Sequence, residues 1–263
     1  MRPSEIAQLL AGADDAGLFS AADALTRENF GSEIYLRGVI EFSNHCVNNC
    51  RYCGLRRANR DVHRYRLSVD EIVSCTALAR ELSLGTVVVQ SGDDYTYTRE
   101  DIGRVVTGAK EQADVAVTLS LGDRPEADFL YWREIGADRY LLKIETFDEA
   151  LYAKSRPGLA LADRLDRVEA LRKAGYEVGS GIITDLPGMT PDILASDLAR
   201  LSALDLDMIA VGPFVPSPGT PYGDAPAGSV LTAFRAMAVL RLLNPLANIP
   251  STSALNALRD GAR

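Results

Sequence analysis

The sequence has few cysteines, no long apolar run and no excess of positive charge. Its 263 residues include four cysteines, 28 lysines and arginines, and 36 aspartates and glutamates, which gives a net charge of −8. Surfaces that bind duplex nucleic acid neutralise phosphates with clustered Lys and Arg, and this balance argues against one. No stretch approaches the roughly 18 apolar residues that a membrane-spanning helix requires. We therefore expect neither nucleic acid nor a membrane as a partner.

The first residues, Met-Arg-Pro-Ser-Glu-Ile, contain no apolar core of the length found in export signals. We therefore expect a cytoplasmic protein whose thiols stay reduced, and this argues against disulfides. The hydrophobic fraction of 47% and the charged fraction of 24% are ordinary for a globular protein. The length suits either one α/β barrel or two smaller domains.

Three of the four cysteines lie within eight positions. Cys46, Cys50 and Cys53 form the pattern C-x3-C-x2-C, directly after an apolar stretch that is typical of a β-strand. The pattern supplies three thiolates, one fewer than a closed cluster or a structural zinc site needs. An iron–sulfur cube that is held by three protein ligands keeps one iron open for chemistry.

A zinc site is the alternative, and it needs a fourth ligand. Cys75 lies in a helix-like segment and is expected on the apolar face of that helix. His45 is next to Cys46, too close for an easy tetrahedral arrangement, so His63 is the better candidate. The run 51–66 contains six arginines and is either a solvated loop or a positive rim near an anionic cluster or substrate.

Strand-like and helix-like segments alternate along the chain. Residues 4–28 are expected to form one or two leading helices that plug or cap one end of the fold. Ser68 and Glu71 form a capping box, which predicts the start of a helix. The predicted helices include residues 68–82, 98–112, 162–174 and 190–204. The predicted strands are residues 34–42, 86–90, 115–121, 139–145, 177–184, 208–215 and, weakly, 248–255.

This alternation predicts a parallel sheet, either doubly wound or closed into a barrel. In both architectures the active groups gather at the carboxyl ends of the strands. The polar segments fit this rule, because the cysteines follow the first strand, residues 91–94 follow the second, Ser120 closes the third and Glu145 ends the fourth. Too few residues follow the seventh predicted strand to finish an eight-unit barrel, so we expect an open barrel or a shortened chain.

The cysteine run, with Tyr52 before its last cysteine, resembles the signature of radical S-adenosylmethionine (SAM) enzymes. Across residues 30–255 the chain resembles the FeFe-hydrogenase maturase HydE family, which is related to methylornithine synthase and biotin synthase. The resemblance implies an α/β fold, a parallel (β/α) TIM-type barrel over residues 31–263 that lacks its last βα unit, after a helical extension over residues 1–30. The segments that carry the resemblance are 34–44, 64–68, 88–94, 117–122, 140–146 and 212–216.

The resemblance also implies chemistry. Three thiolates hold a 4Fe-4S cluster, SAM binds the fourth iron, and one electron splits SAM into methionine and a 5′-deoxyadenosyl radical. HydE-type enzymes use this reaction in the maturation of the FeFe-hydrogenase diiron centre. The implied partners are a small organometallic or amino-acid-like substrate, a reductant such as flavodoxin or ferredoxin, and other hydrogenase maturation proteins. A methylornithine-synthase-like or biotin-synthase-like enzyme and a non-catalytic metal-binding barrel are the alternatives.

Site residues are assigned by the same resemblance. Arg164 matches an arginine expected near the SAM carboxylate, although a surface position on its helix is the simpler interpretation. Lys143 stands where the family is expected to have arginine, and it lacks the planar fork of that side chain. The predicted cluster ligands and catalytic residues are Cys46, Cys50 and Cys53. The predicted cofactor-binding residues are Tyr52, Ser91, Gly92, Ser120, Glu145, Arg164 and Met208. The predicted substrate-cavity residues are Thr118, Lys143, Thr252 and Ser253.

Overall fold

The computed structural model describes residues 1–258 and contains one six-stranded parallel sheet. The strands follow each other in the order β1 to β6. A doubly wound sheet reverses its strand order at a switch point, whereas a barrel adds each strand beside the previous one. The fold is therefore of the TIM-barrel type, although β1 and β6 are not paired within the described residues. The strands are β1 (Gly38–Ser43), β2 (Thr86–Ser91), β3 (Ala116–Ser120), β4 (Arg139–Leu141), β5 (Glu177–Thr184) and β6 (Met208–Pro213).

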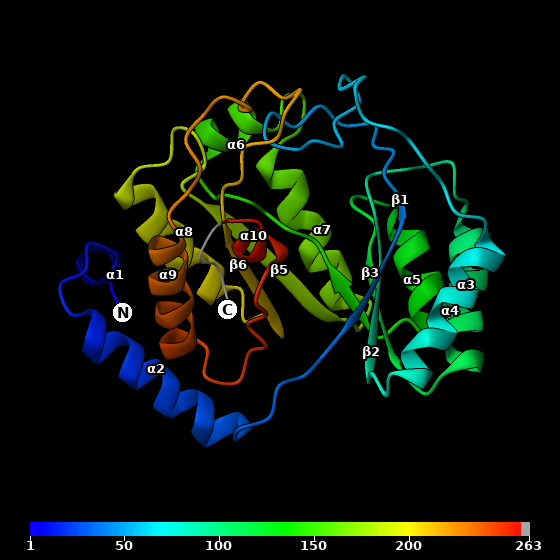
Figure 1. Cartoon of the computed structure of the whole chain (residues 1–263), viewed down its shortest axis with the longest axis horizontal. Coiled ribbons are helices and arrows are strands. Elements are labelled where there is room, and N and C mark those ends of the chain that lie inside the picture. Colours follow the sequence, from blue (N-terminus) through cyan, green and yellow to red (C-terminus); the bar gives the residue numbers. More distant parts are fainter. Residues whose placement is uncertain (259–263) are drawn as a thin grey trace.

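Helices cover the outer face of this curved sheet (Figure 1). Within the barrel, a helix follows each strand before the next strand begins, as right-handed parallel connections require. The helices are α1 (Pro3–Leu10), α2 (Asp15–Phe30), α3 (Val69–Glu81), α4 (Arg99–Gln112), α5 (Glu126–Glu134), α6 (Glu149–Ser155), α7 (Leu161–Lys173), α8 (Pro191–Ala203), α9 (Val230–Leu243) and α10 (Ser253–Ala257).

The core lies between the outer face of the sheet and the helices, and side-chain alternation along β3 shows why. Val117 and Leu119 are fully buried in this core. Because successive side chains of a strand point to opposite faces, Thr118 and Ser120 point to the inner face of the sheet. The hydroxyl of Thr118 is buried and has no hydrogen-bond partner within the described residues. The inner face therefore carries polar groups that can meet a ligand.

Helix prediction from the sequence was accurate at α3. Its N-cap Ser68 accepts a hydrogen bond from the amide of Glu71, and the Glu71 carboxylate accepts one from the amide of Ser68, which confirms the predicted capping box. The prediction for Cys75 was wrong, because this residue is exposed on α3. Thr76 and Ala79 occupy the buried face of that helix instead.

Three predicted strands differ from the structure, and one of them is the fourth, which was predicted over 139–145 but ends at Leu141. Residues 34–37 were assigned to the first strand, but β1 begins only at Gly38, and Ile34 is 85% exposed. Residues 248–255 were predicted as a seventh strand, and this was wrong. Asn248 makes one isolated bridge to Met208, and the chain then enters α10.

The two leading helices lie on the side of the molecule (Figure 1). Helix α1 packs against α8 and α9, and α2 packs against α9, so the expectation that they plug a barrel end was wrong. Arg235 of α9 fixes this arrangement through two hydrogen bonds of 2.7 Å to the carboxylate of Asp15. Among residues 1–258, every helix is too short or too polar to cross a bilayer.

Candidate active site

The three clustered cysteines lie in one long loop after β1, on the side where the parallel strands end. Cys50 is buried, while Cys46 and Cys53 are half-buried, and all three thiols are free. Burial raises the pKa of the Cys53 thiol to about 12 and also raises the pKa of Cys46, where the Asp93 carboxylate adds to the effect. The thiols of Cys46 and Cys53 are therefore protonated at neutral pH, and a bound metal must displace protons from them.

Arg64 organises this loop. Its Nη1 donates to the carbonyl oxygens of Asn44 and Leu55, and its Nη2 donates to those of Arg56, at 2.8 Å, and Asn59, at 3.0 Å. One planar guanidinium thus satisfies four carbonyls from different parts of the loop, which a lysine ammonium cannot do. Interpreting the arginine run as only a solvated loop is therefore wrong for this residue.

Replacing Arg64 with alanine is expected to loosen the loop and reduce metal loading. The substitution removes four charge-assisted hydrogen bonds, so the free energy of unfolding should fall by about 3 kcal/mol. Iron per chain after anaerobic reconstitution should drop by at least half, and Arg64→Lys should not restore it. Arg60→Ala, an exposed arginine of the same loop, is the matched control. Equal iron content in Arg64→Ala and Arg60→Ala would contradict this role.

The segment after β2 approaches the cysteine loop closely at Gly92. A Cβ atom on Gly92 would overlap the carbonyl oxygen of His45 and lie 2.8 Å from Cβ of Cys46, so only glycine permits the contact. Beside it, the amide of Val47 donates to the carbonyl oxygen of Asp93 at 3.0 Å. The segments after β1 and β2 therefore form one continuous surface.

The buried carboxylate of Asp93 joins three neighbouring segments. Its Oδ2 lies 3.9 Å from Sγ of Cys46 and accepts a short hydrogen bond from Nδ2 of Asn48. Its Oδ1 accepts from the amide of Asp123 at 2.7 Å, and a Cβ atom on Gly122 would overlap that oxygen. Burial raises the pKa of Asp93, and the cationic Arg164 opposes that rise. The sequence placed this residue in a polar strand-end segment but gave no sign of these contacts.

The next residue, Asp94, anchors the end of the cysteine loop. Arg66 donates to both of its carboxylate oxygens, at 2.7 and 3.0 Å, and Ser43 donates at 2.6 Å. Burial by itself would raise the pKa of Asp94, but these hydrogen bonds lower it from 3.8 to about 2. The ionised form of Asp94 therefore stabilises the folded state.

The contribution of Asp94 should be present above about pH 4 and lost as the pH falls to about 2, because its pKa is lowered on folding. The lowered pKa corresponds to about 2 kcal/mol, and the partial exposure of Arg66 reduces this to about 1–2 kcal/mol. We expect urea unfolding to show wild type more stable than Asp94→Asn by that amount at pH 6, with the difference vanishing near pH 2. A difference that does not depend on pH would contradict the assignment.

A second cluster of buried polar side chains surrounds Tyr52. Its hydroxyl donates to Oε1 of Glu145 at 3.4 Å, and Nζ of Lys143 lies 3.9 Å from Oε2 of Glu145. Glu145 has a φ of 73°, a left-handed conformation that is strained for this residue, and its Oε2 has no hydrogen-bond partner within the described residues. Such an unpaired carboxylate oxygen is available to a bound cation or N–H donor.

Arg156, which sequence reasoning missed, lies beside this cluster. Arg156 is only 4% exposed, and its Nε has no hydrogen-bond partner among the described residues. Burial alone would lower the pKa of Arg156, but Tyr52, Cys50 and Glu145 raise it. A permanent cation is therefore buried close to the thiols, where it can balance the negative charge of thiolates.

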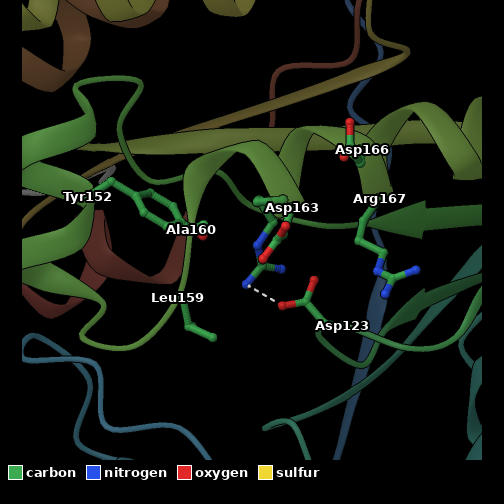
Figure 2. Close-up of a pocket in the computed structure, with 8 residues that line it drawn as sticks. Asp123, Tyr152, Leu159, Ala160, Asp163, Asp166 and Arg167 are labelled. Atoms are coloured by element: carbon green, nitrogen blue, oxygen red, sulfur yellow. Dashed lines mark ion pairs between the residues drawn. The ribbon is translucent and has the colours of Figure 1, made fainter.

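Arg164 on α7 lines a cavity of about 310 Å³ (Figure 2). It is buried, so the surface interpretation of this arginine is wrong. Its Nη2 pairs with Oδ2 of Asp123 at 3.2 Å, and both Nε of Arg164 and Oδ1 of Asp123 are left without side-chain hydrogen-bond partners among the described residues. The remaining residues around this cavity are Tyr152, Leu159, Ala160, Asp163, Asp166 and Arg167.

A second cavity, of about 180 Å³, contains four of the predicted site residues together: Tyr52, Lys143, Thr252 and Ser253. Gly212 permits it, because a Cβ atom at that position would overlap Oγ1 of Thr252. The other lining residues are Ile183, Pro213, Phe214, Val215 and Ala254.

Three other predicted residues are placed elsewhere. Ser91 and Ser120 end β2 and β3, near the cysteine loop, but neither lines a cavity described above. Met208 begins β6, at the opposite end of the sheet, and its sulfur lies 3.2 Å from Nη1 of Arg37. The structure therefore does not bring Met208 to the predicted cofactor site, because a residue that starts a parallel strand lies at the far end from the loops that follow the strands.

The donor set fits a cluster better than a single ion. Within residues 1–258, no three His, Cys, Asp or Glu side chains converge closely enough to bind one metal ion. None of the fourth zinc ligands considered, Cys75, His45 and His63, therefore joins the thiols in such a group within the described residues. Each thiolate of an iron–sulfur cube binds a different iron, so its ligands need not meet at one point. The three thiols suit such a cube. The side chains of Glu145 and Arg164, whose Oε2 and Nε have no hydrogen-bond partner among the described residues, suit a ligand that carries both a positive and a negative charge.

The Radical SAM superfamily pattern matches residues 40–201. Over 246 residues the chain is 42% identical to the [FeFe] hydrogenase maturase subunit HydE of Thermotoga maritima, which covers 94% of this chain and 70% of the relative. It is 32% identical over 247 residues to 3-methylornithine synthase of Methanosarcina barkeri, which covers 93% and 69%. The crystal structure of methylornithine synthase PylB superposes with a TM-score of 0.88 at 30% identity, over 95% of this chain and 75% of that one.

Proposed function

The chain belongs to the radical SAM superfamily, and we propose that it acts as a HydE-like maturase in assembly of the FeFe-hydrogenase diiron centre. The observation that carries the proposal is the loop of three free thiols at the carboxyl ends of the strands, in a chain 42% identical to HydE over 94% of its length. We place this activity in the cytoplasm, where thiols stay reduced, with a reductant such as flavodoxin or ferredoxin as electron donor.

Cys46, Cys50 and Cys53 would hold the 4Fe-4S cluster. When bound, the cluster supplies the electron that splits SAM into methionine and a 5′-deoxyadenosyl radical. The protein contributes binding, orientation and exclusion of water. Three thiolates leave one iron free of protein ligands, and that iron is where SAM would bind.

The charged groups beside the loop would bind the methionine part of SAM. The buried Arg164 would pair with the carboxylate, because guanidinium and carboxylate form strong charge-assisted hydrogen bonds. The segment from Ser91 to Asp93 would meet the amino group, since Gly92 presents backbone there without side-chain obstruction. The unpaired Oε2 of Glu145 offers a further acceptor.

The cavity around Lys143 would bind the substrate. Its volume of about 180 Å³ and its lining of Lys143, Thr252 and Ser253 suit a small anionic molecule such as an iron–carbonyl–cyanide precursor. The ammonium of Lys143 lies 3.9 Å from Glu145 and keeps a positive charge in the cavity. Lysine provides a point charge rather than a bidentate fork, so it selects for charge more than for shape.

A methylornithine-synthase-like mutase is the second candidate. The TM-score of 0.88 to methylornithine synthase favours it, and Lys143 could equally pair with the carboxylate of an amino-acid substrate. Thr252 and Ser253 could then bind its amino group. Thus the two candidates differ in substrate but share the cofactor chemistry.

The test is anaerobic reconstitution with iron and sulfide, followed by three assays. We expect about four irons per chain, a cluster signal in the electron paramagnetic resonance (EPR) spectrum and cleavage of SAM to 5′-deoxyadenosine. The loaded protein should then activate FeFe-hydrogenase when it replaces HydE in a reconstituted maturation mixture. Formation of 3-methylornithine without hydrogenase activation would favour the second candidate. One zinc per chain without SAM cleavage would instead indicate a non-catalytic metal-binding barrel.

A further inference from the structure

The cysteine loop carries an exposed group of arginines that we define as the arginine patch: Arg51, Arg57 and Arg60. Their side chains form no ion pair with the described carboxylates. Other arginines of the same segment are occupied, because Arg64 binds loop carbonyls and Arg66 pairs with Asp94. The three patch residues therefore carry positive charges that no carboxylate neutralises by an ion pair among the described residues.

The patch is unusual in its electrostatic setting. The whole chain has a net charge of −8, with 36 acidic and 28 basic residues. Between residues 51 and 66, however, six arginines accompany a single acidic residue, Asp61. A local positive field on an acidic protein attracts an acidic partner and orients it toward this one surface.

The patch is also next to the thiols. Arg51 directly follows Cys50 in the sequence, and the amide of Arg57 donates at 2.8 Å to the carbonyl oxygen of Asn48. Val47, in the same loop, is 43% exposed and adds apolar surface beside the charges. A protein that docks on the patch would thus contact the loop that carries the proposed cluster ligands.

We propose that the arginine patch docks an acidic one-electron carrier protein, such as a reduced flavodoxin or ferredoxin; this rests on the proposed function. In the docked pair, one electron leaves the reduced carrier and enters the oxidised cluster, so the carrier is oxidised by one electron and the cluster is reduced by one. No bond or proton is exchanged. Charge complementarity supports an acidic carrier over other partners, because the rest of this acidic chain would repel it elsewhere.

Binding is tested with a purified, strongly acidic bacterial flavodoxin that carries a fluorescent label. The titration uses reconstituted protein at 20 mM and 300 mM salt. We expect the affinity of wild type to fall at least tenfold at the higher salt, since surface charge pairs are screened. Arg57→Glu should weaken binding at least tenfold at 20 mM salt, and the triple reversal of Arg51, Arg57 and Arg60 should remove it.

The matched control is Arg80→Glu, which makes the same charge change at an exposed arginine of α3, near the opposite end of the strands. It should bind flavodoxin like wild type, and iron counts on all variants should match, which shows that the loop still folds. The proposal would be overturned if Arg80→Glu weakened binding as much as Arg57→Glu does, or if the affinity did not depend on the salt concentration. It would also be overturned if a labelled single-stranded oligonucleotide bound more tightly than flavodoxin.

Failure of docking can be separated from failure of the proposed function. SAM cleavage by wild type is measured with photoreduced 5-deazaflavin, a small reductant that needs no docking surface. If wild type cleaves SAM but flavodoxin binding does not depend on the patch, the docking proposal alone is wrong. If wild type fails to cleave SAM with this reductant, the proposed function is wrong.

Discussion

Replacing Cys50 with alanine is expected to abolish SAM cleavage and to remove most of the iron from the reconstituted protein. The reason is the count of ligands: the loop offers three thiols, and two cannot hold three corners of a cube. Cys50 is the most buried of the three, so water is poorly placed to substitute for its sulfur. The same result is expected for Cys46→Ala and Cys53→Ala. Iron and sulfide counts, the EPR spectrum and the yield of 5′-deoxyadenosine measure it.

Cys75→Ala is the matched control for these variants. Cys75 is exposed on α3, outside the cysteine loop, so its removal should leave iron content and SAM cleavage almost unchanged. Loss of the metal in Cys75→Ala with retention in Cys50→Ala would show that the ligand assignment is incorrect. All four variants should unfold cooperatively in the apo form, which separates loss of a ligand from loss of the fold.

Replacing Arg164 with alanine is expected to weaken SAM binding by about 1.5–3 kcal/mol, which is the scale of a hydrogen bond to a charged group. This corresponds to a roughly 10- to 150-fold higher dissociation constant. The buried position of Arg164 at a 310 Å³ cavity, with Nε still unpaired, is the reason to expect so large an effect. Anaerobic equilibrium dialysis with labelled SAM, on cluster-loaded protein, measures it.

Two further variants test whether a loss of SAM affinity in Arg164→Ala is specific to the guanidinium of Arg164. Arg172→Ala removes an exposed arginine from the same helix, so it should leave the dissociation constant within twofold of wild type. Arg164→Lys keeps the charge but loses the fork, and it should recover only part of the affinity. An unchanged SAM affinity in Arg164→Ala would leave Arg164 with only a structural role, as the partner of Asp123.

Much of the fold was predictable because strand and helix periodicities are local. The first six strands were all found within a few residues, and the capping box of Ser68 and Glu71 fixed the start of α3. The fourth strand was predicted too long, because β4 ends at Leu141 although Leu142 and Ile144 still donate to carbonyl oxygens of β5, and nothing local reveals the left-handed backbone at Glu145. The segment from 248 to 255 looked like a strand, yet whether such a segment pairs depends on tertiary context rather than on its composition.

The residues of the candidate site were likewise predictable only where a local sequence signal marks them. The cysteine spacing is a local signal and was visible at once, whereas the roles of Arg64 and Arg156 depend on contacts between distant or folded segments. Arg64 lay within a recognised arginine run, but the run did not distinguish a residue that binds four carbonyls from exposed neighbours. Nothing in the sequence marked Arg156 as buried. Met208 was assigned to the cofactor site by the resemblance, although the predicted strand over 208–215 already put this residue at the start of its strand, opposite to the loops that carry the site.

Asp93 has a consequence for how the two halves of the site respond to each other. One carboxylate touches the thiol of Cys46 and holds the amide of Asp123, whose own carboxylate pairs with Arg164. We therefore expect cluster binding at the thiols and SAM binding at Arg164 to change each other's free energy, because Asp93 contacts both sites. This coupling is reciprocal: if the bound cluster raises the affinity for SAM by some factor, bound SAM raises the affinity for the cluster by the same factor.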